Sequence, residues 1–162
     1  LESRNAYLNL SRLGAVVREY APDMYGVSDS PLHRGLGTDR FVAMWELDTP
    51  RVQTRMAGAR GPGLDELLDF PVAFKVIQDP RGEGLPDPEM PDDGIWIQGR
   101  EAGGLRVPIP PDIQSLRDRD PALAARWREA TRCILHRAAL DGWEVRELVR
   151  GPELSYYLVV PG

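Results

Sequence analysis

Asp39, Arg40 and Trp45 have the side chains in this sequence best suited to binding a small substrate. The guanidinium group of Arg40 can hold a carboxylate through two parallel hydrogen bonds. Asp39 lies directly before it, and Trp45 adds an aromatic surface on a strand expected at residues 40–47. This spacing predicts a site for a small carboxylate-bearing molecule. A structural ion pair between Asp39 and Arg40 is the alternative.

Histidine and cysteine offer two further candidates. His33 lies in a long loop, where an imidazole that titrates near neutral pH could act as a base; a solvated loop histidine is the alternative. Cys133 and His136 lie three residues apart on an expected helix, so a thiolate–imidazole pair is sterically feasible. We favour an inert thiol beside a surface histidine. The six carboxylates of residues 79–93 do not follow the spacing of an EF-hand loop, and we expect no metal there.

Composition limits the classes of function. The chain has 162 residues and a formal net charge of −5, which argues against nonspecific binding of nucleic acid. Its single cysteine allows no internal disulfide. No apolar run approaches the roughly 18 residues that span a bilayer, so we expect no membrane association and a cytoplasmic location. The first residue is Leu rather than Met, which suggests a fragment, a processed chain or an unseen beginning.

The first part of the chain is expected to form a helix and two strands around these residues. The helix covers residues 3–14 and ends at Gly14, where a helix C-terminus favours a residue that accepts positive φ. Strands follow at 15–20 and 40–47. The glycine-rich segment 57–63 predicts a linker, which divides the chain into regions 1–56 and 64–162.

The second region is expected to mix helices and short strands. A helical turn at 64–70 precedes a strand at 71–77 and a polar loop at 79–94. Two short strands at 95–98 and 105–109 are expected to form a hairpin, and a short helix begins near Pro110. The chain then predicts a helix at 120–142 and two antiparallel strands, at 143–149 and 154–160.

The helix at 120–142 has the clearest signals in the sequence. Asp120 is a natural N-cap, Pro121 fits the first helical position, and Gly142 marks the end. Its expected core-facing stripe consists of Leu123, Trp127, Ala130, Ile134 and Ala138. Its expected outer face carries a small basic ridge of Arg128, Arg132 and His136.

Helix, glycine, strand and strand therefore occur twice, at 3–47 and at 120–160. A degenerate internal repeat is one explanation. The other is that a helix followed by a hairpin is simply a common arrangement.

The run from Ser3 to Ala15 resembles the late helix of the GNAT (N-acetyltransferase) superfamily, with matches at Ala6, Leu13 and Gly14. Together with residues 24–26 and 34–47, it resembles a predicted GNAT-like acyltransferase family, similar to proteins encoded beside N-acylamino-acid racemases. The resemblance implies an α+β fold, in which residues 1–56 form a GNAT-like C-terminal arm of a helix followed by antiparallel strands. A second, mixed α/β region follows.

The resemblance also implies roles for individual residues. Asn5 and Asn9 would hydrogen-bond the pantetheine arm of acetyl-CoA or another acyl-CoA; the alternative is that they are polar residues at the helix start and on its surface. Leu10 occupies the place of the tyrosine that protonates the leaving thiolate, so Tyr7 or Tyr25 would have to replace it. Tyr25, with Asp39, Arg40 and Trp45, would bind the acceptor, a small amine or amino acid.

The loop that binds the CoA pyrophosphate in this superfamily is missing. It precedes the helix, and only three residues precede Arg4 here. We therefore expect the C-terminal portion of an N-acyltransferase, inactive by itself, that forms a homodimer or pairs with a missing N-terminal half. The alternative is a noncatalytic module for interaction or small-molecule binding. A severed enzyme should expose an apolar edge on its first strand, whereas a module should have that edge paired.

Overall fold

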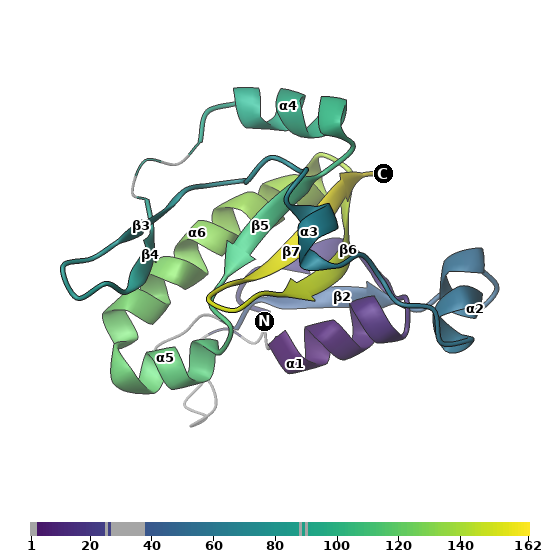
Figure 1. Cartoon of the computed structure of the whole chain (residues 1–162), viewed down its shortest axis with the longest axis horizontal. Coiled ribbons are helices and arrows are strands. Elements are labelled where there is room, and N and C mark those ends of the chain that lie inside the picture. Colours follow the sequence, from purple (N-terminus) through teal and green to yellow (C-terminus); the bar gives the residue numbers. More distant parts are fainter. Residues whose placement is uncertain (1–2, 25, 27–37, 88, 90) are drawn as a thin grey trace.

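The protein has an α+β fold built on an antiparallel sheet of five strands, with the order β2-β1-β6-β7-β5 (Figure 1). The computed structural model describes residues 3–24, 26, 38–87, 89 and 91–162. The strands of the sheet are β1 (Val16–Ala21), β2 (Arg40–Met44), β5 (Leu105–Ile109), β6 (Trp143–Arg150) and β7 (Ser155–Pro161). A second, two-stranded sheet pairs β3 (Val76–Gln78) with β4 (Gly84–Pro86).

Helices surround the five-stranded sheet. Those of the described residues are α1 (Ser3–Ala6), the π-helix η1 (Tyr7–Arg12), α2 (Pro50–Met56), α3 (Leu64–Leu67), α4 (Gly94–Ala102), α5 (Ile113–Arg119) and α6 (Pro121–Leu140). None of them has both the length and the apolar character that crossing a bilayer would need.

The long helix α6 forms where the sequence predicts it and covers one face of the sheet (Figure 1). Its N-cap is Asp120, whose carboxylate accepts a hydrogen bond from the Leu123 amide at 3.0 Å. The chain leaves the helix through Gly142 at φ 76°. The predicted core-facing stripe is confirmed, because all five of its residues are buried.

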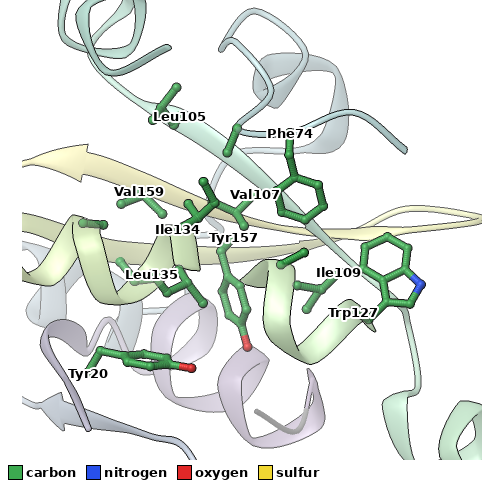
Figure 2. Packing of buried hydrophobic residues seen from close by; sticks show 14 of the residues in the cluster. Tyr20, Phe74, Leu105, Val107, Ile109, Trp127, Ile134, Leu135, Tyr157 and Val159 are labelled. Carbon is green, nitrogen blue, oxygen red and sulfur yellow. The ribbon is translucent and has the colours of Figure 1, made fainter. Parts of the chain in front are cut away.

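The two faces of the sheet pack against different helices. Along β7, Tyr157 and Val159 point into the main core with α6, and Leu158 points to a smaller cluster with Leu67 of α3. This alternation is the two-residue period of a strand. Figure 2 shows Tyr157 and Val159 among the aliphatic and aromatic side chains of the main core. Both faces of the sheet are therefore buried around β6 and β7.

The first helix supports the middle of the sheet. It ends before Gly14, which has φ 78°, and the chain then enters β1 as predicted. β1 pairs with β2 along its length and with β6 at Val17 and Val145. Farther along β6, the hydrogen bonds come from Ser11 of η1. Its hydroxyl donates to the Leu148 carbonyl and accepts from the Leu148 amide. The sheet thus joins strands from both sides of residues 57–63.

The hairpin predicted from residues 95–98 and 105–109 is wrong. Residues 94–102 form α4, and β5 pairs with β7 instead. The chain leaves α4 at Gly103, which has φ 78°, and Trp96 and Gly99 are buried three residues apart, as on one side of a helix. At Gly99 a Cβ atom would lie 2.6 Å from Leu105, so only glycine allows this close packing. The helix end at Gly103 and the packing of Gly99 against Leu105 outweigh the strand propensity of Ile95 and Ile97.

Other boundaries also differ from the prediction. β2 ends at Met44, and α2 follows at Pro50, where Thr49 is the N-cap. The strand predicted at 71–77 is regular only from Val76, although residues 71–73 hydrogen-bond to β5 through Arg106. The loop predicted at 79–94 contains β4.

Candidate functional site

The basic ridge predicted on the outer face of α6 is wrong, because that face is covered. Arg128 is only 8% exposed, and Arg132 is half-buried. The His136 ring lies 6.1 Å from the ring of Tyr20. The cause is β1, which packs on α6, together with the entry to β2. The helix therefore buries two faces, and the second one contains charge.

Asp39 is the centre of this second face, where it is fully buried. Its Oδ2 accepts from the Tyr20 hydroxyl at 2.6 Å and from Arg132 Nε at 3.0 Å. Its Oδ1 accepts from Arg132 Nη2 at 2.7 Å and from the Asp23 amide at 3.0 Å. Arg132 also holds the Asp23 carboxylate through both of its Nη atoms. Both oxygens of Asp39 and all three nitrogens of the Arg132 guanidinium are therefore engaged.

These contacts fix the ionisation states. Burial alone would raise the pKa of Asp39, but hydrogen bonds from Tyr20, the Asp23 amide and Arg132 outweigh it, and the pKa lies below its usual value. Burial, followed by the hydrogen bond to Asp39, raises the pKa of Tyr20 well above its usual value. Near neutral pH, Asp39 is therefore a carboxylate and Tyr20 a neutral phenol.

Arg128 differs from Arg132, because its Nη1 atom is buried and has no hydrogen-bond partner among the described residues. Burial lowers the pKa of Arg128, and the charge of Asp39 opposes that shift. The Tyr157 hydroxyl nearby is also fully buried and without a partner in the described part of the chain. An arginine keeps its charge in proteins, so this buried donor remains cationic.

Arg128 lines a small cavity, of about 20 Å³, between α6 and the corner where β5 leads into α5. The other lining residues are Ile109, Pro110, Ile113, Trp127 and Thr131. Figure 2 shows Ile109 and Trp127 beside the neighbouring core residues. A cationic donor without a partner, next to a cavity with mostly apolar walls, is suited to bind a small anion. We call Arg128, Arg132, Asp39, Tyr20 and Tyr157 the Arg128 cluster.

A larger groove, of about 400 Å³, lies between the β3–β4 hairpin and the start of α6. Its two arginines are exposed and its two aspartates are half-buried, and three of these four side chains are paired with one another. Arg81 joins Asp79 and Asp120 at 2.9 Å each, and the same Asp120 caps α6. These contacts give the charged side chains a structural role, because they connect the hairpin to the start of α6. The groove is therefore the weaker candidate for a binding site.

The residues predicted to bind acyl-CoA lie on the first helix. Asn5 is exposed on α1, and Asn9 is half-buried on η1, where its carbonyl accepts from the Ala15 amide at 2.9 Å. Neither lines the cavity beside Arg128. Tyr25 and His33 lie outside the described residues.

The residues predicted to bind the acceptor lie in two different places. Asp39 belongs to the Arg128 cluster, and Arg40 lies next to it, where its Nη1 donates to the Asp39 carbonyl at 2.9 Å. Trp45 is 47% exposed, and its indole nitrogen donates to the Leu13 carbonyl at 3.0 Å. Trp45 thus connects the end of β2 to the end of the first helix.

Sequence reasoning missed Arg128, Tyr20 and Tyr157 as site residues. A signal for Arg128 is present in the sequence. Ala124, Arg128, Thr131 and Leu135 follow helical spacing, and all four are buried. This second stripe begins and ends with apolar residues. It indicates that Arg128 sits on a buried face.

Two other features of the described residues bear on chemistry. Partial desolvation and the nearby Glu129 raise the pKa of the Cys133 thiol, which leaves it a poor nucleophile. Within those residues, no group of three or more His, Cys, Asp or Glu side chains is placed to hold a metal ion.

Comparison with known protein families, with characterised proteins and with solved structures found no match to this chain. The geometry of the Arg128 cluster is therefore the basis for assigning a function.

Proposed function

We propose that this chain is a small-molecule-binding module whose ligand is a small carboxylate held by Arg128. The observation that carries the proposal is the buried Nη1 of Arg128, which has no partner among the described residues. A buried guanidinium nitrogen that makes no hydrogen bond costs free energy, of which the nearby charge of Asp39 offsets a part. A ligand carboxylate would offset that cost.

The pairing of β1 supports a binding module over half of an enzyme cleft. β1 has β2 on one side and β6 on the other, and its Val16, Val17 and Tyr20 are buried. The apolar edge expected on the first strand of a severed enzyme is therefore occupied within the described residues.

Thermal unfolding with formate and acetate, the smallest carboxylates, tests the proposal. We expect at least one of these carboxylates to raise the Tm of the wild-type chain at millimolar concentration. The shift should vanish in Arg128→Met. It should persist in Arg126→Met, which removes an exposed arginine two residues away on the same helix. Equal shifts in both variants, or no shift with any carboxylate in the wild type, would refute the proposal.

Acyl transfer within a longer chain is the second candidate. The observation that favours it is the helix, glycine and strand pair at residues 3–44, with Gly14 at φ 78°. In this candidate the groups that bind the CoA pyrophosphate lie on other polypeptide. Calorimetry with acetyl-CoA tests it: binding weaker than millimolar agrees with it, and micromolar affinity for this chain alone would contradict it.

A further inference from the structure

We infer that the small cavity beside Arg128 binds a single chloride ion, and that chloride and the carboxylate compete for Arg128. The inference rests on the proposed function, because it concerns the regulation of the same site. It predicts that the affinity for the carboxylate falls as the chloride concentration rises.

The size of the cavity suits an anion of one atom. Its volume is about 20 Å³, which accommodates about one water molecule. A chloride ion is a single atom and only slightly larger than a water molecule. A carboxylate group is larger, but the cavity is not fully enclosed, so one carboxylate oxygen can enter it while the rest of the molecule stays outside. Chloride and that oxygen would occupy the same position, so the two ligands exclude each other.

The charges of the Arg128 cluster leave one positive charge to balance. Asp39 is the partner of Arg132, at 2.7 Å. The two tyrosines of the cluster are neutral phenols, because burial raises the pKa of both. Asp23, the second carboxylate that binds Arg132, is exposed, so solvent screens its charge. The charge of Arg128 therefore exceeds what the cluster balances, and one monovalent anion would neutralise it.

The side chains around the cavity favour an anion over a water molecule. A buried water typically makes about three hydrogen bonds and needs acceptors for its own hydrogens. Arg128 can only donate. The indole nitrogen of Trp127 donates to the Gly84 carbonyl at 3.1 Å, and the Thr131 hydroxyl donates to carbonyls of its own helix at 2.9 and 3.0 Å. The other described lining residues are apolar. Chloride needs only donors, and it also brings the charge that a water lacks.

Chlorine NMR tests the site, because chloride that exchanges with a protein site broadens the signal of free chloride. We expect the wild-type chain to broaden the signal more than Arg128→Met does, and Arg126→Met to broaden it as much as the wild type does. Since each variant lacks one arginine, general attraction of chloride to surface arginines does not explain a difference between them. Formate should reduce the wild-type broadening to the level of Arg128→Met.

Calorimetric titration of the wild type with formate tests the competition. The apparent Kd for formate should rise about twofold when chloride is present at its own Kd, relative to a chloride-free buffer. Sodium fluoride at the same concentration is the control for ionic strength. Fluoride is more strongly hydrated than chloride and loses more free energy on entering an apolar site, so it should leave the Kd nearly unchanged. Equal weakening by both salts would indicate screening and would overturn the competition.

The outcomes separate the inference from the proposed function. If formate binds in a manner that depends on Arg128 but chloride does not, the inference is wrong and the carboxylate site stands. If chloride binding depends on Arg128 and formate does not bind, the chloride site stands and the carboxylate function is wrong. If neither anion depends on Arg128, both are wrong and the cavity holds only water. Retained folding of Arg128→Met, checked by far-UV circular dichroism, excludes an unfolded variant as the cause of lost binding.

Discussion

Two clusters of buried charge use arginine differently. In the Glu147 cluster (Glu147, Arg51 and Arg55), Glu147 accepts from Arg51 at 2.9 Å and from Arg55 at 2.5 Å. Arg51 also donates to the carbonyls of Leu10 and Gly14, each at 3.1 Å. This cluster attaches α2 to the first helix and to β6.

In the Arg128 cluster, Arg132 has the same attaching role through Asp39, but Arg128 does not. Its Nη1 is buried without a partner in the described part of the chain. Burial of charge alone thus does not mark a site. Arg55 Nε and Glu147 Oε2 also lack partners among the described residues, but the Arg55 guanidinium as a whole has Glu147 as its acceptor. The difference therefore lies in whether each guanidinium has any acceptor. Three substitutions, with two control variants, and one pH titration test that difference.

The largest expected loss of stability follows Glu147→Gln. It removes the charge between Arg51 and Arg55, and breaking a buried ion pair from one side costs about 3–5 kcal/mol. Urea unfolding measures the change. The control is Glu153→Gln, an exposed residue in the turn after β6. A loss below about 1 kcal/mol, the range of exposed ion pairs, would contradict a structural role for the Glu147 cluster.

Asp39→Asn is expected to cost somewhat less, about 2–4 kcal/mol. Arg132 would keep Asp23 as a carboxylate partner, so its charge would still be paired. The same urea experiment measures the loss. If Asp39→Asn leaves the free energy of unfolding unchanged, the four hydrogen bonds of the Asp39 carboxylate do not attach β1 and the start of β2 to α6.

Acid should weaken the same contact. The pKa of Asp39 lies below its usual value, so its contribution to stability is complete above about pH 4 and is lost as pH falls through the lower folded value. Other carboxylates with lowered pKa, such as Asp112 and Glu144, titrate in the same range. The difference between wild type and Asp39→Asn isolates Asp39. The wild type should lose stability more steeply below pH 4, and parallel curves would contradict the shift.

The helix α6 and the strands after it could be predicted from the sequence because their signals are local. Asp120, Pro121 and Gly142 mark the ends of α6, and its apolar stripe has helical period. β6 and β7 likewise follow directly after α6 and are rich in the β-branched and aromatic residues that favour strands. These features need no knowledge of the rest of the fold.

The Arg128 cluster could not be assembled from the sequence because its parts come together only in three dimensions. Asp39 lies 93 positions from Arg132 along the chain. Periodicity located one buried face of α6, but the residues that cover the second face come from β1 and the start of β2. The strand predicted at residues 95–98 failed for a related reason, since packing of Gly99 against Leu105 favours a helix there.

The smallest expected change in stability follows Arg128→Met, and its free energy of unfolding in urea, without added carboxylate, tests the central claim most directly. Removing a buried charge that lacks a partner should leave stability unchanged or raise it by about 1 kcal/mol. Arg126→Met should stay within roughly 0.5 kcal/mol of wild type. A loss of about 3 kcal/mol or more in Arg128→Met, as expected for Glu147→Gln, would show that Arg128 holds the fold together, and would contradict its assignment to a ligand.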